Sequence, residues 1–394
     1  MQLLYALNPP RRFQEQRRNK YVPQAGSSHR IDIMHILPFV LLFLTTSHAL
    51  DLGLRADHLS PSIDPTNIAI SPSGGGTYPR LACLSDGSIL GAYTVFRGTT
   101  KTLTVTRSTN GGRTFSAWGT VAQSTGDLDN LFLQQLPNGD VLATFRNHDV
   151  PNGVDYTWYR ITAYISHNNG RTWAFLSQID ERGAALFKNG LWEPFARIAH
   201  NGAIQVYYSS ENDDGDQDIL MKSSPDNGTT WSLPFTVAGG TTHGRDGMPG
   251  LAEYTVDGVT YLLCVFETTE GTGTFTVKSV VSTDDGASWG GRASVYVPTR
   301  KNAGAPQIAT TSTGTLVVSF MTDEDNTSPH NWARGAAFKI ITSASLAVPS
   351  WGQKTTVLPI SSYWPSLLSR TDGSGTVIGC ADTDGARCRS ISFS

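Results

Sequence analysis

Two glutamates in this sequence have surroundings that suit acid and base chemistry. Glu193 lies in Leu191-Trp192-Glu193-Pro194-Phe195, where the aromatic neighbours would exclude water from its carboxyl and raise its pKa. Glu267 directly follows the apolar segment LLCVF at residues 262–266. Hydrolysis of a glycosidic bond requires one carboxylic acid that protonates the leaving oxygen and one carboxylate that attacks the anomeric carbon or activates water. We therefore predict that Glu193 and Glu267 form such a catalytic pair, with their individual roles unassigned.

Aromatic and charged residues near the predicted strand ends are candidates for binding a sugar. Flat rings stack on sugar faces, while arginines and carboxylates bind hydroxyl groups or a substrate carboxylate. We predict substrate-binding roles for Tyr78, Arg97, Asp129, Arg146, Trp192, Arg245, Asp246, Tyr363 and Trp364. For most of these residues the competing explanation is simple solvation of a strand end, or a salt bridge between an arginine and a neighbouring acid.

Neither a metal ion nor a cofactor is predicted. The acidic run DDGDQD at residues 213–218 lacks the order and spacing of an EF-hand loop. A solvated loop is therefore the favoured interpretation of this segment.

A short pattern that recurs six times predicts the strands that carry these residues. In each copy a strand begins near a proline or asparagine, runs to a Gly turn and returns as a hydrophobic strand. The copies span residues 79–87, 130–139, 194–202, 249–258, 306–314 and 365–373. The ends of each hairpin opposite its Gly turn should lie on one face, so that Glu193 and Glu267 face each other from neighbouring hairpins. Glu253 is a weaker candidate, because it lies close to Gly258 and is expected near the other face.

A second pattern recurs every 58 residues. It reads Ser-x-Asn/Asp-x-Gly-x-Thr/Ser-Phe/Trp and begins at Ser108, Ser166, Ser224 and Ser282. Such a sequence forms a turn in which the Asp or Asn side chain bonds to the loop backbone and the glycine adopts a positive φ. The pattern resembles the Asp-box of sialidase-like β-propellers. Six hairpins at this period account for residues 50–394, so we predict an all-β fold of six four-stranded blades, closed by the segment around residues 67–71.

The segments around the candidate residues resemble glycoside hydrolase family 93, the fungal exo-α-1,5-L-arabinanases. The resemblance extends over about residues 55–394 and is carried by LWEPF at 191–195, RDGMPG at 245–250, VFE at 265–267 and YWPSLL at 363–368. It implies a six-bladed propeller that releases arabinobiose from the non-reducing end of linear arabinan with retention of configuration. It also implies that Glu193 and Glu267 are the two catalytic glutamates.

Two other functions stay open at this point. A sialidase shares the propeller and the Asp-box, but it uses a tyrosine nucleophile and three arginines that grip the substrate carboxylate. Tyr363, Arg80 and two of the arginines named above are candidates for that arrangement. A non-catalytic sugar-binding propeller would repeat one pocket in every blade, whereas the residues at the six strand starts differ.

Composition and the N-terminal segment indicate a secreted globular protein. The 394 residues carry a net charge of -3, with 39% hydrophobic and 16% charged residues, which argues against a disordered chain and against a nucleic-acid partner. The apolar segment 36–44 has signal-peptide length and is shorter than the roughly 20 residues that span a bilayer. We expect residues 1–49 to be a leader and signal peptide, with Met34 as an alternative start, and the secreted chain to be a monomer without a membrane partner. Cys380 and Cys388 flank a turn, and both a disulfide and free thiols are compatible with their spacing.

Overall fold

The computed structural model describes residues 59–72, 74–271 and 273–394. The predicted leader and signal peptide at residues 1–49, with the alternative start at Met34, lies outside the described residues. Residues 50–58 of the predicted catalytic domain lie outside them as well.

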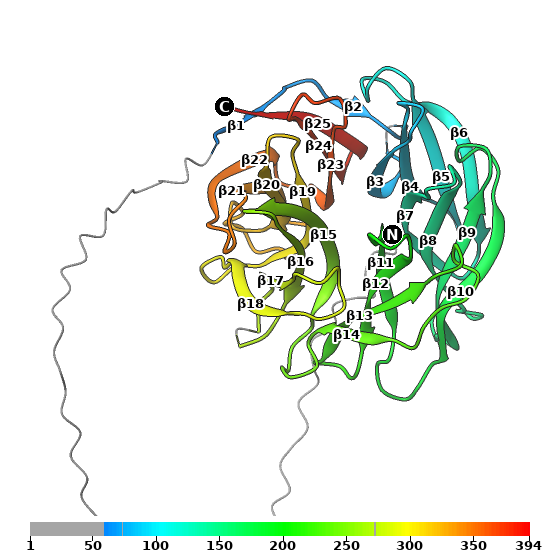
Figure 1. The fold of residues 1–394 in the computed structure, drawn as a ribbon. Coiled ribbons are helices and arrows are strands. Elements are labelled where there is room, and N and C mark those ends of the chain that lie inside the picture. The colour runs from blue at the N-terminus through cyan, green and yellow to red at the C-terminus, as the bar shows by residue number, and fades with distance from the viewer. Residues whose placement is uncertain (1–58, 73, 272) are drawn as a thin grey trace, which may run out of the picture. The chain divides into compact units, whose positions relative to one another are not determined.

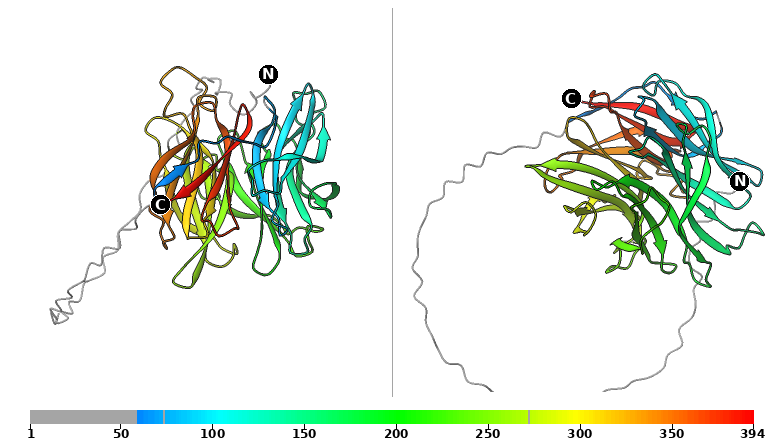
Figure 2. Two further views of the ribbon diagram at one scale, coloured as in Figure 1. Left: turned by 90° about the horizontal axis from the view of Figure 1, so that it is seen from above. Right: turned by 45° about the vertical axis from the view of Figure 1, so that its right-hand side comes forward.

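The described chain folds into six antiparallel sheets around a central axis (Figure 1). All of its regular elements are strands. Seen edge-on, the strands run from one face of the ring toward the other, so that the two ends of a strand lie on opposite faces (Figure 2, left). The prediction of an all-β, six-bladed propeller is therefore confirmed.

Each of the first five blades is formed by four consecutive strands, and the first of the four lies at the axis. The first blade contains β3 (Thr77–Cys83), β4 (Ile89–Arg97), β5 (Thr100–Ser108) and β6 (Ser116–Ser124), and the second contains β7 (Asp127–Gln135), β8 (Val141–His148), β9 (Trp158–Ser166) and β10 (Ala174–Gly183). The third contains β11 (Leu191–Ile198), β12 (Ile204–Glu211), β13 (Gln217–Ser224) and β14 (Phe235–Ala238), and the fourth contains β15 (Gly247–Val256), β16 (Val259–Thr268), β17 (Thr276–Ser282) and β18 (Gly290–Tyr296). The fifth contains β19 (Ala303–Thr310), β20 (Thr315–Thr322), β21 (Ala337–Ala344) and β22 (Gly352–Leu358).

The sixth blade joins the two ends of the described chain. It consists of β23 (Tyr363–Ser369), β24 (Val377–Thr383) and β25 (Gly385–Phe393), with β1 (Pro61–Ile63) and β2 (Ile68–Ala69) both paired to β25. The predicted closure by the segment around residues 67–71 is confirmed, and β1 extends it. Cys380 and Cys388 are partners across β24 and β25 and form a disulfide, whereas Cys83 and Cys264 are free thiols.

The four repeats with the 58-residue period form turns between the third and fourth strands of blades one to four. In the turn after β17, the Ser282 hydroxyl donates to Asp284 at 2.7 Å, and Asp284 accepts the backbone N–H of Ser288 at 2.9 Å. Gly286 has a φ of +88°, and a Cβ there would lie 2.8 Å from the hydroxyl of Tyr207 in the preceding blade. These turns lie at the face of the ring opposite to the starts of the innermost strands, and their hydrogen bonds have a structural role.

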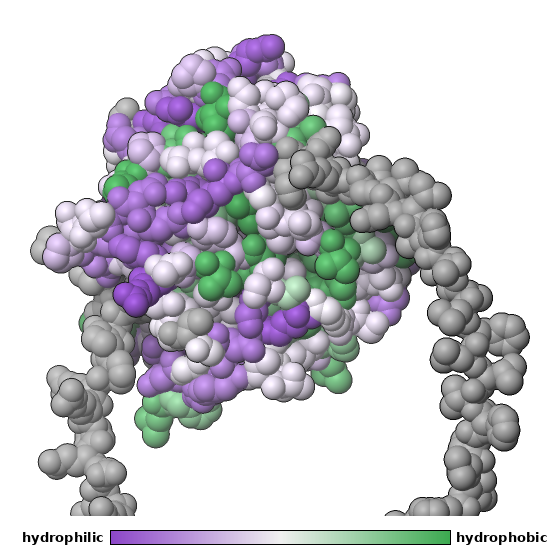
Figure 3. Space-filling model, turned by 90° about the vertical axis from the view of Figure 1, so that its left-hand side faces the viewer, coloured by the Kyte–Doolittle hydropathy of each residue, from purple (hydrophilic) through white to green (hydrophobic). Residues whose placement is uncertain are grey.

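Apolar side chains on the facing sides of neighbouring blades form the core. Phe145, Phe266 and Phe320, each from the second strand of its blade, are fully buried. Removal of apolar surface from water stabilises the fold by about 25 cal/mol per Å², so this packing holds the inner strands in place. On the side of the molecule shown in Figure 3, hydrophobic residues occur in small groups among hydrophilic ones. Within the described ranges, the chain has no helix with the length and hydrophobicity of a membrane span.

Candidate active site

Each innermost strand has a β-bulge at the same place near its start. Two successive residues are skipped in the pairing with the second strand, and the first of them has a φ of 50–58° without being glycine. Bulges re-aim side chains, and strained backbone of this kind is concentrated at functional sites. The six residues are Tyr78, Asn130, Glu193, Met248, Ala305 and Trp364.

Four of these six residues pack together near the axis. Tyr78, Met248 and Ala305 belong to three different blades, yet they share one packed cluster with Trp364 of a fourth. The bulge residues of the second and fourth blades are Asn130 and Met248. The sequence instead suggests Asp129 and Asp246 as the site residues at these two strand starts.

Glu193 is the axial residue of the third blade. Its Oε2 accepts a hydrogen bond from the Ser209 hydroxyl at 3.1 Å, and the Ser209 oxygen accepts the backbone N–H of Met248 at 3.0 Å. Burial raises the pKa of Glu193, while Arg146, the Ser209 hydroxyl and Arg245 favour the ionised form and limit the rise. Glu193 is thus a desolvated carboxyl with one hydrogen-bond donor and two nearby positive charges.

Glu267 lies at the end of β16 in the next blade, opposite Gly247 in the pairing with β15. Its Oε2 accepts the backbone N–H of Ala305 at 2.7 Å. Burial raises the pKa of Glu267 to about 7; the Ala305 N–H opposes this rise, and the negative charge of Glu193 adds to it. Glu267 can therefore carry a proton near neutral pH.

Gly247 lies close to Glu267 and to the serine that binds Glu193. A Cβ at this position would be 3.6 Å from Oε1 of Glu267 and 3.6 Å from the Ser209 oxygen that binds Glu193. The structure thus places the two predicted catalytic residues in one site, contributed by adjacent blades.

Arg146 and Arg245 flank Glu193 and are both ion-paired. Arg146 lies 3.0 Å from Asp127 and 3.5 Å from Asp129, and its guanidinium lies 5.2 Å from the centre of the Trp192 ring. Arg245 donates to Glu211 at 2.7 Å and to Gln217 at 2.9 Å. The salt-bridge explanation therefore applies to both arginines and to Asp129. The positive charges of the two arginines still favour the ionised form of Glu193.

Three of the predicted aromatic residues surround the axis. The Tyr78 ring is buried beneath the Arg80 guanidinium at 3.8 Å, and its pKa is raised to about 12 by burial. The backbone carbonyl of the half-buried Trp364 accepts a hydrogen bond from Arg80 at 3.2 Å. The Tyr363 hydroxyl donates to the carbonyl of Arg334 at 3.2 Å.

Trp192, the residue before Glu193, is also half-buried. Its indole packs edge-on against His148, with ring centres 5.0 Å apart, and against Tyr159 at 5.9 Å. His148 is buried, and desolvation lowers its pKa to about 3, so it packs here as a neutral ring. This aromatic cluster supports the strand segment that carries Glu193.

Two predicted substrate-binding residues have other positions. Asp246 is fully buried, and its two oxygens accept hydrogen bonds from Arg292 at 2.7 and 2.9 Å. A sugar cannot reach this carboxylate, so the expectation of a substrate contact was wrong for Asp246. Arg97 is exposed at the end of β4, and within the described chain no hydrogen bond or ion pair joins it to the residues around Glu193.

Three residues that the sequence did not single out as site residues contribute to the site. Ser209 binds Glu193, as described above. Asp382, at the end of β24, has its pKa raised to about 6 by burial, and the charge of Asp129 adds to this rise. Trp332, in the segment between β20 and β21, would lie 3.0 Å from a Cβ on Gly304, and that same Cβ would be 2.3 Å from Oε2 of Glu267. Asp382 follows the rule that found Glu267, whereas Ser209 and Trp332 belong to no repeated pattern.

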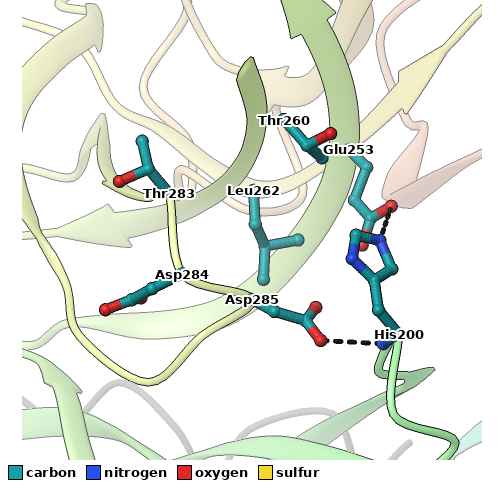
Figure 4. Close-up of a pocket in the computed structure, with 7 residues that line it drawn as sticks. All are labelled: His200, Glu253, Thr260, Leu262, Thr283, Asp284 and Asp285. Atoms are coloured by element: carbon teal, nitrogen blue, oxygen red, sulfur yellow. Dashed lines mark hydrogen bonds and ion pairs between the residues drawn. The ribbon is translucent and has the colours of Figure 1, made fainter. Parts of the chain in front are cut away.

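A surface pocket of about 180 Å³ lies on the opposite face, next to the turns at Gly202, Gly258 and Gly286 (Figure 4). His200, Glu253 and Asp285 point toward one another there, and among the described residues they form the group of acidic and histidine side chains with metal-ligand spacing. Arg197 pairs with both carboxylates, at 2.6 Å from Asp285. The arginine offsets one of the two negative charges and ties both carboxylates into ion pairs, so we assign this group a structural role.

Comparisons with known proteins relate this chain to solved structures alone. No model of a protein family matches the sequence, and a search of curated proteins finds no significant match. The structure is similar to that of a Penicillium chrysogenum α-L-arabinanase complexed with arabinobiose, with a TM-score of 0.65, 20% identity and coverage of 84% of this chain and 98% of that chain. It is also similar to the GH93 α-L-arabinofuranosidase of Fusarium graminearum with arabinobiose, with a TM-score of 0.65, 21% identity and coverage of 83% and 96%.

The chain shares the fold of these structures. A Hadza microbial sialidase has the same kind of fold at a TM-score of 0.57, 13% identity and coverage of 81% of this chain and 66% of that chain. A common propeller does not decide between these activities, because function depends on the residues of the site.

Proposed function

We propose that this protein is a glycoside hydrolase that releases arabinobiose from the non-reducing end of linear α-1,5-L-arabinan with retention of configuration. The observation that carries the proposal is the pair of desolvated carboxyls, Glu193 and Glu267, which come from adjacent blades and lie near enough for the charge of Glu193 to act on Glu267. The overlap in fold with an arabinanase and an arabinofuranosidase, each described with arabinobiose, supports the choice of sugar. The predicted signal peptide supports secretion, where a plant polysaccharide would be met.

The environments of the two glutamates support different roles. Glu267, with a pKa raised to about 7, keeps a proton that it can donate to the leaving oxygen. Glu193 is held by the Ser209 hydroxyl and lies near Arg146 and Arg245, which favour its ionised form, so it is the proposed nucleophile. After the glycosyl–Glu193 ester forms, the ionised Glu267 would take a proton from the water that hydrolyses it.

The arginines argue against the sialidase alternative. Arg146 and Arg245 already bind acids, and Arg80 donates to two backbone carbonyls and lies over Tyr78. Three arginines free to grip a substrate carboxylate would have to break these contacts. The sialidase nucleophile would be Tyr363, whose hydroxyl donates to the backbone carbonyl of Arg334.

Product analysis on linear α-1,5-arabinan, with a sialoside as the control substrate, tests the proposal. The proteins to compare are the secreted form, Glu193→Gln, Glu267→Gln and Glu253→Gln, the last of which changes a glutamate on the opposite face. We expect arabinobiose from the wild type and from Glu253→Gln, and a loss of about 1000-fold or more with the other two. An aryl arabinoside with a good leaving group should restore glycosylation in Glu267→Gln but not in Glu193→Gln, because only the acid becomes dispensable.

The initial product should have the configuration of the substrate, as read by proton NMR in the first minutes of the reaction. An inverted product would require a water molecule between the two carboxyls and would overturn the assignment of Glu193 as nucleophile. Release of sialic acid without arabinan cleavage would favour the sialidase. Binding of arabinan without cleavage would favour the non-catalytic propeller.

A further inference from the structure

The segment between β20 and β21 forms a wall beside Glu267. Trp332 of this segment packs in the axial cluster that contains Met248, Ala305 and Trp364. The tip of its indole and Oε2 of Glu267 approach the same point above Gly304, where a Cβ would be 3.0 Å from the one and 2.3 Å from the other. The tip of the indole ring and the carboxyl oxygen are therefore neighbours beside Gly304.

The wall is anchored on both sides. His330 pairs with Asp323 at 3.1 Å, and Lys301 donates to the carbonyl of Asn326 at 2.5 Å, which ties the segment to the fifth blade. The Tyr363 hydroxyl donates to the carbonyl of Arg334 and ties it to the sixth blade. The Trp332 ring also packs against Phe275, with ring centres 5.5 Å apart.

The indole N–H of Trp332 is buried and has no hydrogen-bond partner among the described residues. Burial of a hydrogen-bond donor without a partner is unfavourable. The packing of the ring in the axial cluster must outweigh this unfavourable burial. This balance points to a role for the apolar surface of Trp332 at the site.

We propose that Trp332 is a positioning residue that seals the fifth-blade side of Glu267 against water and thereby keeps this carboxyl ready to donate a proton. The inference rests on the proposed function, because it assigns the proton donor of that reaction. Trp332 lies in a connection outside the repeated strands. An apolar wall beside a carboxyl favours its neutral, protonated form, which is the form that can act as the acid.

The charged groups that face Glu267 from other elements act on its protonation in opposite directions. Glu193 from β11 favours the protonated form, and Arg245, just before β15, opposes it. Lys278 on the adjacent β17 is bound to Glu270, and Asp323 and His330 in the wall are bound to each other. On β19, the packed neighbour that donates to Glu267 is the Ala305 N–H, which favours the ionised form.

The test compares Trp332→Ala with Trp332→Phe and Trp332→Leu. A matched control is Trp351→Ala, which removes a half-buried tryptophan that packs between blades just before β22, near the opposite face. One readout is the pH dependence of kcat/KM on arabinan oligosaccharides. The other is the titration of Glu267 by carbon-13 NMR of labelled glutamate carboxyls, with Glu267→Gln used to assign the signal.

We expect Trp332→Ala to lower the Glu267 midpoint by about one pH unit or more, which is a tenfold change in its ionisation constant, and to shift the basic limb of kcat/KM equally. Trp332→Phe should stay within about 0.3 unit of the wild type, and Trp332→Leu should lie between them. Trp351→Ala should leave the midpoint unchanged. If Trp332→Ala does not fold, a Glu267 midpoint that is lower in Trp332→Leu than in Trp332→Phe still tests the inference.

An unchanged Glu267 midpoint in a folded Trp332→Ala or Trp332→Leu variant would overturn the inference and leave Trp332 a packing residue. The carboxyl titration needs no turnover, so it separates this failure from that of the proposed function. A protein that cleaves no arabinan would refute the function, while a shifted midpoint would still support the seal.

Discussion

The backbone N–H of Ala305 donates a 2.7 Å hydrogen bond to Oε2 of Glu267, so the innermost strand of the fifth blade holds a carboxyl that belongs to the fourth. This contact depends on the bulge that gives Ala305 a φ of 50° and on the absence of a side chain at Gly304. The geometry of the site is thus a property of adjacent blades in register.

Gly304→Ala should displace Glu267. The new Cβ would be 2.3 Å from Oε2, far inside van der Waals contact, and the carboxyl would have to leave the Ala305 N–H. We expect kcat to fall by about 100-fold or more, with a loss of about 1–3 kcal/mol in the free energy of unfolding. Gly290→Ala is the control, because nothing lies within 4 Å of the added carbon. Equal activity of the two variants would contradict the assigned position of Glu267.

Ser209→Ala should affect Glu193 through protonation. Removal of the hydroxyl takes away a donor that stabilises the carboxylate and leaves the Met248 N–H without its acceptor. The acidic limb of the kcat/KM profile should move to higher pH, with a fall of about 10-fold at the optimum. Ser294→Ala, at an exposed position on β18, should change neither value. A lower kcat with an unmoved acidic limb would mean that Ser209 acts on the fold alone.

Glu267→Gln should change how stability depends on pH. The folded state raises the pKa of Glu267 from 4.5 to about 7, so between these values the folded protein binds more protons than the unfolded chain. The free energy of unfolding of the wild type should therefore fall as the pH rises from about 4.5 to 7, by at most about 3 kcal/mol from this group. Urea denaturation of both proteins at pH 5 and pH 7.5 should show the Gln variant gaining relative stability at the higher pH. Parallel changes in the two proteins would argue against a raised pKa.

Asp246→Asn should destabilise the protein without weakening sugar binding. The substitution leaves Arg292 partly unpaired beside a buried amide, which costs about 3–5 kcal/mol when one partner of a buried ion pair is lost. The remaining contact of Arg292 with Glu270 at 2.7 Å should moderate this loss. KM on arabinan oligosaccharides should stay within about twofold of the wild type for the folded fraction. A large rise in KM with unchanged stability would restore Asp246 as a substrate ligand.

The sequence alone predicts the number of blades and the hairpins of their inner strands, and it points to Glu193 and Glu267 as candidate residues. These features follow from local patterns, since strand periodicity, Gly turns and the 58-residue repeat depend on residues close together in the chain. The carboxylates at strand ends could be found in the same way, because strand direction alone assigns them to a face.

Which side chains meet depends on contacts that form only in the folded protein. The bulges shift the axial residue to Met248 in the fourth blade, and Asp246 is removed from the site by Arg292, which lies 46 residues further along the chain. Trp332 comes from a segment that no repeat predicts, and it reaches Glu267 only because the fourth and fifth blades pack side by side. Such contacts depend on the packing of distant segments and on desolvation at their interface, which no local pattern in a single sequence encodes.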